Sequence, residues 1–142
     1  VAAATEKKKR GQERRAQVAQ KKKRVRELLA TGKQHLKSGR YSEANQAFLS
    51  AIRENGRSAA AYSGLGAVAN KQGKFEQALV HHGKSAKLSP GNADYQVNQG
   101  MAYFKLKKYP LAKTSWTQAL QISPKHKRAA KYLRMIEKKL GK

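Results

Sequence analysis

Apolar and polar positions follow the same order three times along the chain. Residues 71–90 read KQGKFEQALVHHGKSAKLSP, with a glycine among polar residues, an aromatic residue, and then a helix-like run ending in Ser-Pro. The pattern recurs thirty-four residues earlier as KSGRYSEANQAFLSAIRENG, and thirty-four residues later as KLKKYPLAKTSWTQALQISP. A period of about 20–50 residues is typical of repeat architectures. The pattern therefore predicts three copies of one supersecondary unit.

The copies align without gaps over residues 25–58, 59–92 and 93–126. Small residues at positions 8 and 20 let two helices approach closely, and bulky residues at positions 17 and 24 fill the space beside them. Proline at position 32 ends a helix, because it lacks the amide hydrogen that a continuing helix needs. In position order the shared residues are Gly32, Gly66 and Gly100; Tyr41, Phe75 and Tyr109; Ala44, Ala78 and Ala112; Phe48, His82 and Trp116; and Gly56, Pro90 and Pro124.

A different pattern follows the third copy. Residues 127–140 place Ala129, Leu133, Ile136 and Leu140 along one helical stripe, and the other side of that helix is almost wholly Lys and Arg. Such a helix covers the last repeat of an array with its apolar side and keeps the end soluble with its charged side. We therefore expect a capping helix here.

With these positions the chain resembles the tetratricopeptide-repeat (TPR) family. Its unit of about 34 residues is a helix–turn–helix with Gly at position 8, Ala at 20, an aromatic near 24 and Pro at 32. The resemblance covers residues 25–126, although copy one lacks the terminal proline and copy three has Lys107 at the turn glycine. It implies an all-α, right-handed superhelical solenoid of helix–turn–helix repeats. We expect a TPR domain over residues 25–142.

Charge sets the two ends of the chain apart from its middle. The chain has 32 Lys and Arg against 8 Asp and Glu, a net charge of +24. Residues 1–24 hold ten basic and two acidic residues, and residues 127–142 hold seven and one. Residues 1–24 also lack an apolar stripe, and Gly11 and like-charge crowding make their isolated helicity marginal. We interpret them as a basic N-terminal extension or linker.

Residues that carry catalysis are sparse. The chain has no Cys, which removes disulfides and thiolate chemistry, and its eight acidic residues leave no evident carboxylate pair for acid–base catalysis. The four His are scattered, and no His, Asp or Glu stands four residues away from His81 or His82. We expect no enzyme, no cofactor, no metal and no small-molecule substrate.

The resemblance also implies a binding surface. In the family, the first helix of each repeat lines a concave groove through positions 2, 5, 9, 12 and 13. Small residues in the second copy leave room there, lysines surround it, and the amide of Asn70 can hold a peptide backbone. We expect the partner to be a protein or peptide that presents an acidic, extended segment. The alternative is that these lysines form an ordinary solvated surface with no binding role. The predicted peptide-binding residues are Lys33, Lys37, Asn70, Lys71, Met101, Phe104 and Lys105.

One known subgroup of the family clamps the acidic C-terminal tails of heat-shock chaperones with Lys, Asn and Arg at five positions. In this chain those positions hold Leu29, Lys33, Gly64, Asp94 and Asn98. Asp94 would repel a carboxylate. The sequence therefore predicts that this clamp is absent.

Two function classes remain. The first is a non-catalytic adaptor or scaffold module, monomeric and cytoplasmic. The alternative is a polyanion-binding module for RNA, DNA or an anionic membrane surface, which would give the extension a membrane-proximal or nuclear role. Binding by charge alone is salt-sensitive, and single-strand recognition needs exposed aromatic residues; seven of the ten aromatics occupy repeat core positions, so only weak polyanion binding is expected. The predicted polyanion-binding residues are Lys7, Lys8, Lys9, Arg10, Lys21, Lys22, Lys23 and Arg24.

Overall fold

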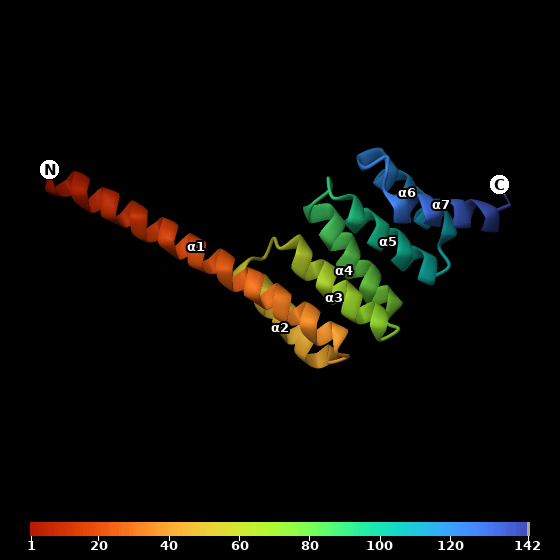
Figure 1. The fold of residues 1–142 in the computed structure, drawn as a ribbon, viewed down its shortest axis with the longest axis horizontal. Helices are drawn as coiled ribbons and strands as arrows, with labels where there is room; N and C mark the ends of the chain where they lie inside the picture. The colour runs from red at the N-terminus through yellow and green to blue at the C-terminus, as the bar shows by residue number, and fades with distance from the viewer. Residues whose placement is uncertain (142) are drawn as a thin grey trace.

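The computed structural model describes residues 1–141, and within them the chain forms helices and no strand. Consecutive helices pair into three hairpins, and a last helix covers the third hairpin (Figure 1). This confirms the predicted all-α repeat solenoid. The helices are α1 (Ala2–Lys37), α2 (Tyr41–Glu54), α3 (Ala59–Lys71), α4 (Phe75–Leu88), α5 (Ala93–Lys105), α6 (Tyr109–Ile122) and α7 (Lys127–Lys139).

The turn inside each hairpin requires a left-handed backbone. Gly39 and Gly73 adopt φ of 76° and 74°, and Lys107 takes the same place in the third hairpin with φ of 61°. A residue with a Cβ atom is less stable in this conformation than glycine, by about 1–2 kcal/mol. The third turn therefore holds a local strain that the first two lack.

Close helix contact within each hairpin depends on the glycine at position 8. A Cβ atom added at Gly32 would come within 2.6 Å of the Phe48 ring, and one added at Gly100 within 2.5 Å of Trp116. His82 stands in the same relation to Gly66, at 2.6 Å. The predicted pairing of small and bulky positions is therefore confirmed, and in the middle hairpin the bulky residue is polar.

The apolar core forms two clusters along the solenoid. The N-terminal cluster gathers Phe48, Leu65 and Val68 around Ala44, and the C-terminal cluster centres on Trp116 and includes Ile136 of α7. Trp116 is fully buried, and its indole Nε1–H donates to the carbonyl oxygen of Val97 at 3.1 Å. Burial of such large aromatic groups is a major source of stability in a fold of this size.

The capping helix α7 is fixed at its first turn. Nδ1 of His126 accepts a hydrogen bond from the Ala129 amide at 3.2 Å, and Nε2 of the same ring lies 2.6 Å from Oδ1 of Asp94 on α5. Ile136 is buried, whereas Leu140 follows the last helical residue and is 37% exposed. The helix and its stripe are thus as predicted up to Ile136, and the burial ends there.

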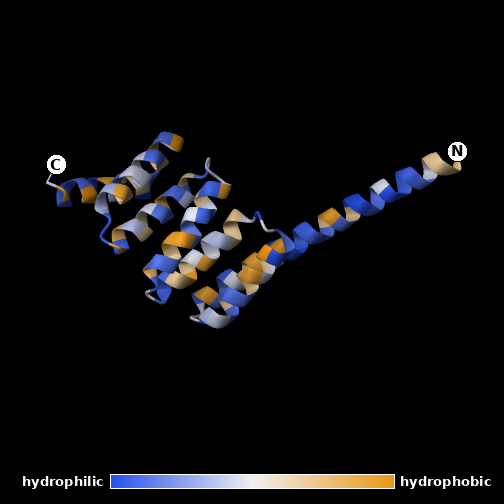
Figure 2. Cartoon of the chain, turned by 180° about the vertical axis from the view of Figure 1, so that it is seen from behind, coloured by the Kyte–Doolittle hydropathy of each residue, from blue (hydrophilic) through white to orange (hydrophobic). Residues whose placement is uncertain are grey.

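The basic residues at the N-terminus belong to α1. This helix has 36 residues, about 54 Å at 1.5 Å per residue, and its first part projects from the body (Figure 1). Figure 2 shows that part as mostly hydrophilic, with apolar residues gathering where α1 joins the repeats. Where α1 meets the end of α2, the Arg24 guanidinium contacts both carboxylate oxygens of Glu54 at 3.2 Å. The helix has no break at residue 24, so the domain division drawn there stays a prediction.

Candidate peptide-binding surface

The first helices of the three hairpins form one surface. Helix α1 contacts α3, and α3 contacts α5, while α2, α4 and α6 are the second helices of their hairpins. Residues at equivalent positions of α1, α3 and α5 are therefore brought toward a common side of the molecule. We call this side the first-helix face; it is where the predicted peptide-binding residues belong.

Three of those residues meet in one place. Lys33 and Lys37 of α1 and Lys71 of α3 line a depression of about 400 Å³, together with Leu36, Gly39 and Tyr41. No carboxylate lines it, and none of the ion pairs found among residues 1–141 involves these lysines. We call it the lysine depression. It combines three ammonium groups with an apolar side chain and an aromatic ring, so it has the chemistry to hold an anionic group beside an apolar one.

Asn70 lies on the same helix as Lys71 but is turned toward the interior. Its Nδ2 is 3.3 Å from Nε2 of His82, and its Oδ1 is buried without a hydrogen-bond partner. Burial lowers the pKa of His82 to about 4, and the neighbouring His81 adds to the shift. His82 is therefore neutral at physiological pH. The expected contact between Asn70 and a peptide backbone would require the amide to leave His82, and it stays a prediction.

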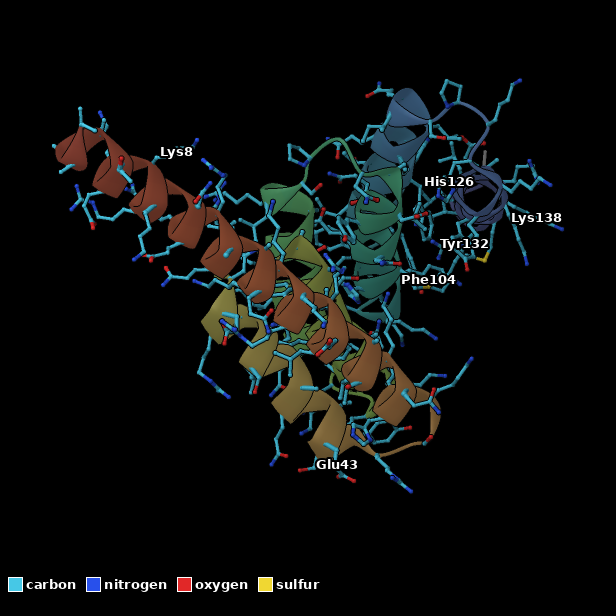
Figure 3. The ribbon with its side chains drawn as sticks, turned by 60° about the vertical axis from the view of Figure 1, so that its left-hand side comes forward. Lys8, Glu43, Phe104, His126, Tyr132 and Lys138 are labelled. Atoms are coloured by element: carbon cyan, nitrogen blue, oxygen red, sulfur yellow. The ribbon has the colours of Figure 1, made fainter. Side chains whose placement is uncertain are left out.

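The predicted residues of α5 lie apart from the lysine depression. Met101 and Phe104 are half-buried against the C-terminal cluster, where the Phe104 ring centroid is 5.4 Å from that of Tyr109 and 6.1 Å from that of Trp116. Figure 3 shows Phe104 on α5 near Tyr132 of α7. Lys105 places its Nζ 5.9 Å from the centroid of the Phe75 ring. These side chains are already engaged within the fold, and their contact with a ligand stays a prediction.

An ion-pair cluster that was not foreseen lies where α5 and α7 begin. Asp94 Oδ1 is 2.6 Å from Nε2 of His126 and 3.3 Å from Nη2 of Arg128. The hydrogen bond from His126 is the main reason that the pKa of the Asp94 carboxyl lies below its ordinary value, and Arg128 acts in the same direction. The Asp94 carboxylate is thus held by residues 32 and 34 positions later in the chain, about one repeat away: His126 donates a hydrogen bond to it, and Arg128 balances its charge.

The predicted polyanion-binding residues are all exposed along the N-terminal two thirds of α1. Among the ion pairs of the described residues, only Arg24 of this set takes part, through Glu54. The other seven basic side chains present their charge to solvent. The charge of the extension is therefore available to an anionic partner.

Within residues 1–141, no three His, Asp or Glu side chains come together in a way that would bind a metal ion. Nor does any helix in that range combine the length and apolar character needed to cross a bilayer.

Sequence comparison gives consistent matches. Two family models described as tetratricopeptide repeat match residues 29–93 and 93–126. The chain is 32% identical over 94 residues to Anaphase-promoting complex subunit 3 of Schizosaccharomyces pombe, and 28% identical over 85 residues to Protein O-mannosyl-transferase Tmtc3 of Drosophila melanogaster. These alignments cover 66% and 60% of this chain but only 14% and 9% of those proteins. The similarity therefore concerns a repeat segment and not the whole of either relative.

Solved structures show the same fold. The first TPR domain of Spaghetti (RPAP3), bound to the HSP90 peptide SRMEEVD, superposes with a TM-score of 0.78 at 21% identity, covering 84% of this chain and 95% of that one. The TPR domain of Sgt2 from Aspergillus fumigatus gives 0.78 at 17% identity, covering 82% of this chain and 79% of that one. The TPR domain of Arabidopsis OM64 gives 0.73 at 23% identity, covering 80% and 94%. At these identities the likeness concerns the fold.

Proposed function

The chain belongs to the tetratricopeptide-repeat family, and from that premise we propose that it is a non-catalytic interaction module that binds an acidic, extended protein segment on its first-helix face. The observation that carries the proposal is the lysine depression, where Lys33, Lys37 and Lys71 converge from two helices with no carboxylate among the lining residues. Like charges brought together at a surface repel one another, and an anionic ligand removes that repulsion.

Charge supplies only part of the expected affinity. An exposed lysine–carboxylate contact contributes about 0.2–1 kcal/mol, because water and salt screen it. Leu36 and Tyr41 line the same depression and are half-buried, so each has apolar area left to cover. Burial of a ligand side chain there adds about 25 cal/mol per Å² of apolar surface. The ligand is therefore a segment in which an acidic residue lies next to an apolar one.

A structural relative supports this ligand class. The first TPR domain of RPAP3 is bound to SRMEEVD, a short peptide with three acidic residues next to a valine and a methionine. In this chain the five clamp positions differ from that subgroup's pattern, and Asp94 is already paired with His126 and Arg128. We therefore place the anionic group of the ligand at the lysine depression and not near Asp94.

The test uses an array of extended peptides in which one or two carboxylates are combined with varied apolar residues, with SRMEEVD included. Peptides bound by the full chain are measured again with Lys33→Glu/Lys71→Glu. The matched control is Lys87→Glu/Lys125→Glu, which makes the same change in net charge at two exposed lysines outside the depression.

We expect the depression variant to weaken binding at least about tenfold, and the control to weaken it much less, because only nearby charges escape screening at physiological salt. Equal weakening by both variants would contradict the assignment to the lysine depression. An array with no bound peptide at all would contradict the proposed function.

A further inference from the structure

The projecting part of α1 carries its charges unevenly around the helix. Seven residues are nearly two turns of an α-helix, so residues at that spacing follow one side. Gly11, Val18 and Val25 form such a line. Neighbours three or four residues away lie on the same side, whereas those two residues away lie on the other side. This divides the charged residues into two groups.

Every position three or four residues from Val18 is a cation: Arg14, Arg15, Lys21 and Lys22. Lys7 and Lys8 stand in the same relation to Gly11. The glutamates follow a different line, since Glu13 is two residues after Gly11 and Glu27 is two residues after Val25. The side that carries Val18 is therefore flanked by positive charge, and the acidic residues lie away from it.

Two shallow, open depressions lie between the side chains along that side. One depression of about 660 Å³ is lined by Gly11, Val18 and the cations Lys7, Arg14, Arg15 and Lys22. A second depression of about 420 Å³ shares Val18 and Lys22 with the first and continues along Val25 to the end of α2. Together they form one continuous furrow, which we call the basic furrow. Its lining includes one carboxylate, Glu54, whose two oxygens are both in contact with Arg24.

The basic furrow continues an interface that the fold already uses. Seven residues after Val25 on the same line is Gly32, where the Phe48 ring of α2 packs against α1. Helix α2 ends at Glu54, beside the furrow, and the chain then turns away to α3. Beyond that point, no helix formed by residues 1–141 lies against the same side of α1 (Figure 1). A further helix placed there would extend the packing of α1 on α2.

We propose that the basic furrow docks an acidic α-helix of a partner protein, one with a narrow apolar stripe at seven-residue spacing and Glu or Asp on both sides of it. The stripe covers Val18 and Val25, and the carboxylates approach the flanking cations. The distance from Lys7 to Arg26 along α1 is about 29 Å, which corresponds to a docked helix of about 20 residues. This interaction is separate from peptide binding at the lysine depression.

Charge and apolar area argue for this occupant over others. A second copy of the chain is disfavoured, because each copy carries a net charge of +24. A phosphate backbone would use the cations but leave the valine line uncovered. Val18 is 51% exposed and is the one large apolar side chain that is exposed along the furrow, which is too little apolar surface to insert into a bilayer.

The test uses the full chain and a labelled synthetic helix of about three heptads. The peptide has Leu at the first and fourth heptad positions, Glu on either side, and Ala or Gln elsewhere. Binding is measured by fluorescence anisotropy at about 0.15 M salt. A DNA duplex of about 20 base pairs and anionic lipid vesicles are titrated in parallel, since both are alternative polyanions.

Two pairs of variants distinguish binding in the basic furrow from binding to the net charge of the helix. Lys7→Gln/Lys21→Gln removes two cations that line the furrow, and Lys9→Gln/Lys23→Gln removes two cations at the same spacing that do not line it. The furrow pair should weaken peptide binding by about two- to thirtyfold, the equivalent of two exposed ion-pair contacts. The control pair should change it less than about twofold.

The second pair tests the valine line. Val18→Gln places an amide on the line, and Ala16→Gln makes a similar change two residues away; circular dichroism of both variants reports any loss of α1 helicity. Val18→Gln should weaken binding by roughly tenfold, through lost apolar contact, and Ala16→Gln should have little effect.

Three results would overturn the proposal: no peptide binding by the wild-type chain, equal losses from both lysine pairs, or duplex or vesicle binding that is tighter than peptide binding and insensitive to Val18→Gln. The variant Lys33→Glu/Lys71→Glu should leave binding of the helical probe unchanged, which keeps this result independent of the peptide-binding proposal.

Discussion

The two ends of the first-helix face differ in how far the side chains at their ligand-facing repeat positions are already engaged. At the α1 end, Lys33 and Lys71 lie in an open depression and make no ion pair among the described residues. At the α7 end, Phe104 packs against Trp116, and Asp94 is bound by His126 and Arg128. The partners at the α7 end come from α6, which carries Trp116, and from the start of α7, where His126 and Arg128 lie. A position in a repeat therefore indicates where a side chain is placed, and the neighbouring helix decides whether it is free.

The largest effect should come from the centre of the C-terminal cluster. Trp116→Ala should lower the free energy of unfolding by about 3–5 kcal/mol, the cost of emptying a large aromatic site, with the hydrogen bond to Val97 also lost. Chemical denaturation measures the loss, and Trp116→Phe, which keeps most of the apolar volume, should lose less. Tryptophan emission like that of free indole in the wild-type protein would contradict the burial.

The buried histidine of the middle repeat, His82, should make the stability of the protein depend on pH. His82 has a pKa of about 4 in the folded protein and about 6.5 when unfolded, so the unfolded state binds the extra proton first as pH falls. The free energy of unfolding should be highest above pH 6.5 and fall by up to about 3 kcal/mol between pH 6.5 and 4. His81, whose pKa is also lowered by burial, acts in the same direction.

The control for this pH dependence is His82→Phe, which installs at position 24 the aromatic residue found in the first repeat. Its stability should fall much less than that of the wild type between pH 6.5 and 4.5, because only the contribution of His81 remains. A further decline should appear only as the Asp94 carboxyl, whose pKa is lowered, gains its proton in more acidic solution. If the free energy of unfolding of His82→Phe fell with pH as steeply as that of the wild type, His82 would not be the cause of the pH dependence.

Loss of the contact between the start of α7 and Asp94 of α5 should lower the stability moderately. His126→Ala removes both the cap of α7 and the contact with Asp94, and should lower the free energy of unfolding by about 1 kcal/mol. His126→Asn can still cap the helix and should recover part of the loss. Thermal denaturation of the two variants distinguishes them, and equal stability of His126→Ala and wild type would show that this cluster does not hold α7 in place.

The smallest effect is expected at the third hairpin turn. Lys107→Gly should raise the free energy of unfolding by about 0.5–1 kcal/mol, since relief of the left-handed backbone outweighs the greater freedom of glycine in the unfolded chain. Gly73→Lys should have the opposite sign at the equivalent turn. Denaturant titration resolves both, and a destabilised Lys107→Gly would mean that the lysine side chain stabilises the turn.

The repeat fold could be predicted because its determinants recur. Gly32 against Phe48 and Gly100 against Trp116 are the same steric pairing at the same spacing, so each copy supports the interpretation of the others. The helical extension could not be predicted in this way, since Gly11 and repelling lysines make local helicity marginal. Its helix continues one that already packs on α2, so the costly nucleation step is not repeated.

The candidate site was harder to predict, because the position of a residue in the repeat does not determine which way its side chain points. Asn70 stands at a family position for ligand contact, but its amide turns inward because His82 brings a polar ring into the core. Met101 and Phe104 stand at such positions too, and they pack on the C-terminal cluster that α7 completes. The lysines were easier to place because no acidic side chain lies near enough to pair with them. The scarcity of acidic residues therefore indicated which lysines make no ion pair, but it did not indicate that Asn70, Met101 and Phe104 already make contacts within the fold.

The most direct test of an open α1 end and an engaged α7 end is the association and dissociation kinetics of an acidic peptide that the wild-type chain binds. Lys33→Glu/Lys71→Glu should slow association and erase its salt dependence, because the charges act mainly on the encounter. Met101→Ala/Phe104→Ala should lower stability, and any effect on bound peptide should appear as faster dissociation. The larger loss of affinity should occur in the lysine variant. A larger loss in the Met101/Phe104 variant, measured where both variants remain folded, would contradict binding at the lysine depression and place the binding centre at the α7 end.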